Sequence, residues 1–204
     1  MYSSINDFYN NYPTTETETV DQSFLMPVQD VKPIAGGVAV LGIIESGSIR
    51  PGDAIEIVGI RATISATCIG KDTVPDSNSK FKRNIDRVSL NVDPSQVVQG
   101  QVLAKPGTLK AYNKFEADVY ALQDFEGWNP GGVSKMEKLK FQLFNSDVGG
   151  APSFSNDTGT IMPGDATKLS ITLDSPVAMK PSLRFAIREG GRTVGAGVVA
   201  KVLE

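Results

Sequence analysis

Residues 184–202 read RFAIREGGRTVGAGVVAKV, two apolar, β-branched stretches on either side of Gly190-Gly191. Two consecutive glycines between such stretches are typical of a two-residue hairpin loop, because both central residues of that turn need positive φ. The stretch therefore predicts two antiparallel strands, over 183–188 and 193–202, joined by a tight turn.

The same pattern extends upstream as far as Phe24. Short runs rich in Val, Ile and Thr are broken by Gly, Pro, Asp and Asn at intervals of about ten residues, which is typical of a β-sandwich or β-barrel. Amphipathic stretches of normal helix length are missing. Further strands are predicted at 38–44, 54–58, 62–69, 115–122, 139–144 and 168–173.

The tripeptide Pro-Gly-Asp occurs at 51–53 and again at 163–165, each time before an alternating strand. Proline presets φ and glycine permits a tight reversal, so both are turn signals. Because the two turns lie far apart, each is assigned to a barrel of its own, with a boundary near Lys105-Pro106. The predicted fold class is all-β, with two consecutive antiparallel β-barrels, over 24–105 and 106–204, after a flexible N-terminal tail over 1–23.

Residues 1–23 are rich in Ser, Asn, Thr and Tyr, carry only acidic charges and show no apolar periodicity. This composition favours a mobile tail. The alternative is that the aromatic residues Tyr2, Phe8, Tyr9 and Tyr12 anchor the segment in a groove on a partner or on the body of the protein.

The composition limits which cellular location and which classes of partner are expected. A single cysteine, Cys68, excludes an intramolecular disulfide, and neither a signal peptide nor an apolar run long enough to span a membrane is present. We therefore predict a cytoplasmic protein with no membrane contact. The net charge of −3 offers no general field for nucleic acid, so DNA is not expected and any RNA contact must be local.

The sequence gives no support for catalysis. Histidine is absent, which removes the commonest general base and metal ligand near neutral pH. The glycines of 37–42 lack the lysine and Ser/Thr of a phosphate-binding loop, and 195–200 matches a dinucleotide fingerprint without a following helix. Cys68 lies in an apolar strand and is interpreted as a buried structural thiol. We predict no enzyme, and no catalytic, metal-binding or cofactor-binding residues.

Lys80, Lys82 and Arg83 form the one tight basic cluster of the sequence. A solvated loop is the plain interpretation of such a cluster. A local phosphate contact is the alternative, because it needs only a few well-placed cations.

Two stretches resemble bacterial-type elongation factor Tu: GQVLAKPGT at 100–108 and the long segment 184–203. Shorter similarities include FLMP at 24–27 and MPGD at 162–165, so the resemblance spans 24–204 and is weakest across 71–98. It implies the two C-terminal β-barrels of that family, of the translation-factor type. The resemblance does not include the family's GTPase domain.

In the family, the aminoacyl end of tRNA lies in a pocket of the first barrel. The resemblance places that pocket at Gln29, Asp30, Lys32, Leu41 and Asn84. Asp30 and Asn84 are kept, whereas Gln29, Lys32 and Leu41 replace a glutamate, a phenylalanine and a threonine. These changes remove an acceptor and a hydroxyl and introduce a bulky side chain, so the resemblance implies a vestigial pocket.

In the second barrel, the family offers glutamine, arginine and threonine to the T stem of tRNA where this chain has Lys140, Phe144 and Gly149. Replacing arginine by phenylalanine removes a bidentate phosphate donor, which implies weakened tRNA binding. In the family, residues matching 186–190 also face the GTPase domain, although hairpin geometry alone explains them. The candidate RNA or partner contacts are Lys80, Lys82, Arg83, Lys140, Arg188, Glu189, Gly190 and Arg192.

Two functions remain. The first is a non-catalytic binding or structural module, a degenerate relative of elongation factor Tu that holds a protein or ribonucleoprotein partner. The second is a translation elongation accessory that acts with a separate GTPase domain to bind aminoacyl-tRNA.

Overall fold

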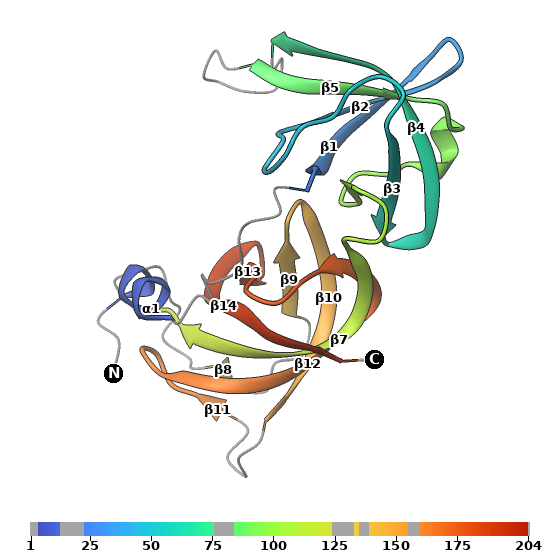
Figure 1. Ribbon diagram of the computed structural model, residues 1–204. Coiled ribbons are helices and arrows are strands. Elements are labelled where there is room, and N and C mark those ends of the chain that lie inside the picture. The colour runs from blue at the N-terminus through green and yellow to red at the C-terminus, as the bar shows by residue number, and fades with distance from the viewer. Residues whose placement is uncertain are drawn as a thin grey trace. The chain divides into compact units, whose positions relative to one another are not determined.

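A computed structural model describes residues 4–12, 23–75, 84–123, 133–134, 139–154 and 160–203. It contains two closed six-stranded antiparallel β-barrels, one after the other along the chain (Figure 1). The chain divides into two compact units, residues 19–111 and residues 1–18 together with 112–204. The predicted all-β fold class is confirmed, whereas the boundaries at 23/24 and 105/106 stay predictions.

The first barrel is closed in the strand order β1-β2-β5-β4-β3-β6. Its core is filled by alternating side chains such as Met26, Val40, Ile57, Val88 and Leu103, all of which are fully buried. Its elements are β1 (Leu25–Ile34), β2 (Gly37–Gly42), β3 (Ala54–Gly59), β4 (Arg61–Pro75), β5 (Asn84–Leu90), the short 3₁₀ helix η1 (Pro94–Gln96) and β6 (Val102–Ala104).

The second barrel is closed in the order β10-β12-β7-β14-β13-β9. Phe115, Phe141 and Phe185 meet in its core, with ring centroids 5.5 and 6.1 Å from that of Phe185. Its strands are β7 (Lys110–Ala121), β9 (Leu139–Leu143), β10 (Ser146–Phe154), β12 (Ala166–Met179), β13 (Arg184–Glu189) and β14 (Arg192–Leu203), and a separate two-stranded sheet joins β8 (Val133–Ser134) to β11 (Thr160–Ile161).

The predicted turns are confirmed. Gly190 and Gly191 have φ values of 54° and 84°, and Glu189 pairs with Arg192 across them, as a tight hairpin requires. Each Pro-Gly-Asp tripeptide forms the same reversal: the Asp53 amide donates to the Arg50 carbonyl, and the Asp165 amide donates to the Met162 carbonyl. One such turn therefore lies in each barrel.

The N-terminal segment differs from the mobile tail that its composition favours. Ile5–Asn11 form a helix, α1, that begins at Ser4 and packs on the second barrel. Phe8 is 1% exposed, and its ring stacks on that of Tyr120 at a centroid distance of 5.7 Å. Burial of this aromatic side chain offsets the entropy of ordering the segment. Residues 4–12 therefore take the docked alternative, whereas 1–3, which include Tyr2, and 13–22 lie outside the described residues.

The close approach of β13 and β14 inside the second barrel gives a test of its packing. A Cβ at Gly197 would lie 2.4 Å from Cζ of Phe185 and 3.0 Å from the Asp118 carbonyl oxygen. Because Phe185 is held by two other rings, we expect Gly197→Ala to lower the free energy of unfolding by roughly 1–3 kcal/mol in denaturant titrations.

Gly70→Ala is the matched control. It lies on a strand of the first barrel, and the nearest atom to its added Cβ is 3.7 Å away, an ordinary contact. We expect little change in stability, and an equal loss for both variants would contradict this account of the packing.

Candidate binding surfaces

The structure brings together three residues of the predicted aminoacyl pocket. Asp30 on β1 lies opposite Leu41 on β2, and Lys32 follows on β1. The Lys32 ammonium is 3.9 Å from Asp30 Oδ2, while Asp30 Oδ1 accepts a hydrogen bond from the Val31 amide at 2.8 Å. Leu41 is 7% exposed. This corner of the barrel therefore holds an engaged carboxylate beside a buried aliphatic side chain.

The other two residues of the predicted pocket, Gln29 and Asn84, lie at irregular or terminal positions of their strands. Gln29 lies where the β1–β2 register shifts between Val28 and Asp30. Asn84 is the first residue of β5 and is exposed. On the same strand, three positions further along, Arg87 pairs with Leu41 of β2. The structure thus places all five predicted residues on β1, β2 and β5, three neighbouring strands of one barrel.

The described cation nearest in sequence to the basic cluster is engaged by a carboxylate. Arg87 on β5 lies opposite Asp72 on β4, and its Nε donates to Asp72 Oδ1 at 2.7 Å while Nη2 donates to Oδ2. These hydrogen bonds hold the pKa of Asp72 below its usual range. Lys80, Lys82 and Arg83 lie outside the described residues.

In the second barrel, the candidate contacts on β9 and β13 lie side by side. Lys140 is exposed and pairs with Arg188 on β13 and with Gly149 on β10. The Arg188 guanidinium has two partners in the chain: Nη1 lies 3.5 Å from Asp147 Oδ2, and Nη2 donates to the Gly191 carbonyl at 2.9 Å. Of these two neighbouring cations, Arg188 is therefore partly engaged by the protein itself, although its buried Nε has no hydrogen-bond partner among the described residues.

A second carboxylate stands close to the same surface. A Cβ placed at Gly149 would lie 2.3 Å from Asp174 Oδ2, so the Asp174 side chain on β12 rests against the glycine backbone. A larger residue at this position would displace that carboxylate. Asp147 and Asp174 offset the charges of Lys140 and Arg188, so this surface offers little net positive charge to a phosphate backbone.

The β13–β14 hairpin is an exposed part of the predicted contact surface. Glu189, Gly190, Gly191 and Arg192 are all exposed. The positive φ angles of the two glycines fix the turn, so its exposed charges are held on a defined backbone.

Helix α1 lies in a groove on the second barrel, as the docked alternative predicted, although the sequence did not indicate which residues line the groove. Tyr12 donates its hydroxyl proton to Asp118 Oδ2 at 3.0 Å, and the Tyr9 hydroxyl donates to the Phe185 carbonyl at 3.4 Å. The Arg184 guanidinium lies 4.5 Å from the Tyr9 ring centroid, a cation–π geometry. Burial raises the pKa of Tyr9, opposed by the nearby Arg184 charge.

One local signal pointed to this helix. Ser4 and Asp7 have the spacing of a helix N-cap, and the Asp7 amide donates to Ser4 Oγ at 3.2 Å. The helix is short, however, and its amphipathic pattern covers too few residues to stand out from the polar sequence around it.

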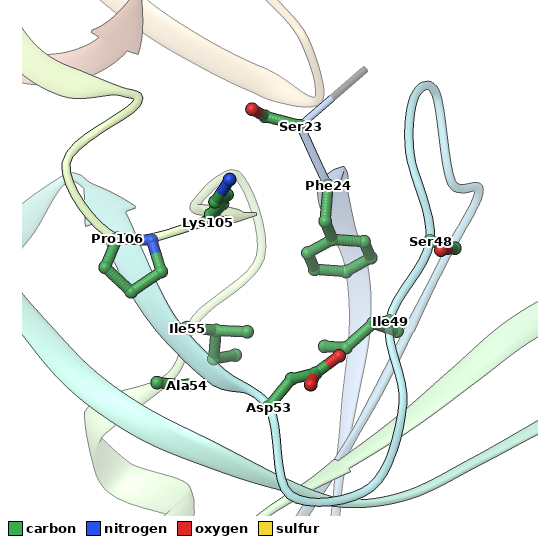
Figure 2. Close-up of a pocket in the computed structure, with 9 residues that line it drawn as sticks. All are labelled: Ser23, Phe24, Ser48, Ile49, Asp53, Ala54, Ile55, Lys105 and Pro106. Atoms are coloured by element: carbon green, nitrogen blue, oxygen red, sulfur yellow. The ribbon is translucent and has the colours of Figure 1, made fainter. Parts of the chain in front are cut away.

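Each barrel also carries a hollow. In the first barrel, a cavity of about 400 Å³ lies beside Phe24. Figure 2 shows the Phe24 ring near Ile49 and Ile55. Asp53 and Lys105 are the two charged residues that line this cavity. In the second barrel, a cleft of about 740 Å³ runs between α1 and the start of β12.

One of the two barrels matches a known protein family. Residues 108–203 match the family model of the elongation factor Tu C-terminal domain. The second barrel is elongation factor Tu-like. The match includes β9, β10, β13 and β14, on which Lys140, Asp147 and Arg188 lie, whereas α1 and the first barrel lie outside it. The second barrel of this chain is thus similar to a domain of a translation factor.

The described residues include no group of three or more Cys, Asp or Glu side chains able to hold a metal ion, and no helix among them is both long and apolar enough for a bilayer. Cys68 is 1% exposed, and its Sγ lies 3.5 Å from the Gly70 carbonyl oxygen. The interpretation of Cys68 as a buried thiol is confirmed.

Cys68 provides a test of this packing. Burial raises the pKa of its thiol, so less thiolate is present at any given pH than in an exposed cysteine. We expect negligible labelling of the native chain by a thiol reagent at pH 7 to 8 and complete labelling in denaturant. Rapid labelling of the native protein would show that the thiol is accessible.

Proposed function

We propose that the two barrels form a non-catalytic, elongation factor Tu-like binding module that works in the cytoplasm and holds a protein or ribonucleoprotein partner. The match of residues 108–203 to the elongation factor Tu C-terminal domain supports a translation-factor origin. In this proposal the module is a degenerate relative of elongation factor Tu, and its affinity for tRNA is weakened.

The engaged state of Arg188 carries the proposal. A phosphate contact needs a cation whose hydrogen bonds are available, and this guanidinium already has Asp147 and the Gly191 carbonyl as partners. Binding RNA here would compete with those contacts and would bring phosphates close to Asp147 and Asp174. The surface on β9, β10 and β13 is therefore better suited to a protein than to a nucleic-acid backbone.

The first barrel supports the same conclusion. By resemblance, Leu41 stands where the family uses a threonine, and it is buried opposite Asp30. An aliphatic side chain offers no hydrogen bond to an aminoacyl ester, and its volume occupies part of the space the ester would need. The carboxylate that remains, that of Asp30, has the Lys32 ammonium 3.9 Å away. We infer that this pocket no longer selects aminoacyl-tRNA.

A role as an accessory to a separate GTPase domain is the second candidate, and the exposed β13–β14 hairpin favours it. Glu189, Gly190 and Arg192 lie within or beside the part of the chain that, by resemblance, faces that domain. Helix α1 argues against it, because Tyr9 rests on Arg184 and hydrogen-bonds to the Phe185 carbonyl on the same strand. A GTPase domain that covered β13 broadly would have to displace α1.

Two experiments separate these functions. Affinity purification of the native protein, followed by identification of associated protein and RNA, is expected to recover a stable protein or ribonucleoprotein partner. Gel-shift titrations with aminoacyl-tRNA, with and without an added elongation factor GTPase domain, are expected to show no affinity above that for unrelated RNA. Tight, aminoacylation-dependent binding would reverse the order of the two candidates.

The state of Arg188 can be tested directly. Asp147→Asn removes the charge that holds the guanidinium, so we expect RNA affinity to rise and the slope of log K against log salt to steepen by about one unit. Glu116→Gln, which changes the net charge equally at an exposed position on β7, is the control. Equal effects of both variants would mean that net charge, and not the release of Arg188, governs binding.

A further inference from the structure

The outer face of the second barrel carries an apolar patch. Successive side chains of a strand alternate between its two faces. Along β7, Ala117 and Val119 face the barrel core, so Asp118 and Tyr120 face outward. Backbone pairing places Ala196 opposite Tyr120 and Val198 opposite Asp118. Tyr120, Ala196 and Val198 are nevertheless at most 1% exposed. An outward-facing apolar patch that is this fully buried must have a cover.

The cover is α1, which is too short to be stable alone. Its seven residues fall below the length at which an isolated helix persists in water, so the groove holds it in place. The groove offers a distinct partner to each of three aromatic side chains: the Tyr120 ring to Phe8, Arg184 and a carbonyl to Tyr9, and Asp118 to Tyr12.

The groove is wider than the helix that lies in it. A cleft of about 740 Å³ remains between Phe8 and Tyr12 on one side and the start of β12 on the other. Ala166 and Ala200 supply apolar wall, and Lys168 places an exposed ammonium on the rim. A longer helix with a larger side chain beyond the position of Tyr12 would fill space that α1 leaves open.

We propose that this groove is the docking site for an amphipathic helix of a protein partner, and that α1 occupies it as a resident competitor. The partner helix presents aromatic residues on one face and an acidic residue toward Lys168. The inference rests on the proposed function, because it names the surface and the partner class of that binding module.

Competition follows from the balance of two effects. The covalent link gives α1 a high effective concentration at the groove, which favours the covered state. A partner helix that also fills the cleft buries additional apolar surface and adds an ion pair with Lys168, so mass action at sufficient concentration favours exchange. The module then binds only partners whose helix fits better than its own.

The test uses the full chain and a fluorescent peptide of residues 4–12, SINDFYNNY, followed by anisotropy. Phe8→Ala removes the ring that anchors α1 and loosens the cover without changing any residue of the barrel strands. We expect this variant to bind the peptide at least about tenfold more tightly than the wild-type chain. Adding Ala196→Arg, which places a bulky cation in the groove, is expected to abolish that binding.

A second peptide tests the unfilled cleft. It continues the same helix beyond the second tyrosine with alanines, a tryptophan three residues later and a glutamate four residues later. We expect it to bind Phe8→Ala several-fold more tightly than the shorter peptide, and Lys168→Glu to remove that advantage while leaving binding of the shorter peptide unchanged. Circular dichroism and cooperative melting check that each variant is folded.

If Phe8→Ala does not fold, Tyr9→Phe with Tyr12→Phe loosens α1 by removing only two hydroxyl groups. The absence of peptide binding to a folded, loosened variant would overturn the proposal, as would equal binding after Ala196→Arg. A loosened chain that binds no peptide but forms dimers would identify a second copy as the occupant and overturn it too.

These outcomes are independent of the test of the proposed function. A module that still co-purifies with its protein partner when Ala196→Arg is present keeps its function and loses this groove as the site. Loss of the partner with Ala196→Arg, but not with Glu116→Gln, supports both the function and the groove.

Discussion

The pairing of β7 with β14 is the constraint on which the second barrel depends. The ladder runs from Lys114 opposite Leu203 to Ala121 opposite Gly195, and it joins the first strand of the barrel to the last. Closure leaves no free sheet edge, so the backbone contributes little to recognition and the outward side chains decide what binds. The same register places Tyr120 beside Ala196, which creates the apolar surface that α1 covers.

Neighbouring strands decide whether a basic residue of this chain is available to bind phosphate. Arg87 and Arg188 are basic residues in the sequence, yet each lies against a carboxylate, Asp72 and Asp147 respectively. A carboxylate beside a guanidinium competes with phosphate for its charge and its donors, so the net contribution of that arginine to phosphate binding is reduced. Lys140 and the exposed hairpin are the exceptions.

Helix α1 changes how the second barrel is understood as a binding module. The matched family domain accounts for the barrel, and the helix lies outside the matched residues. In the proposed exchange with a partner helix, α1 gives the barrel a covered, selective surface beside predicted contacts that carboxylates partly neutralise. Regulation through a small, weakly self-stable helix needs only a few contacts, because elements of low local stability are the ones that open most readily.

The sequence by itself determined the fold class, the hairpin at Gly190-Gly191 and the repeated Pro-Gly-Asp turns, because strand alternation and turn chemistry are local properties. It also determined that Cys68 is buried in an apolar strand. Only the tertiary structure decided that Asp72 and Asp147 engage the two arginines and that Phe8 reaches Tyr120. Those contacts join residues brought together by strand register and barrel closure, and neither charge nor hydrophobicity along the chain records which strands become neighbours.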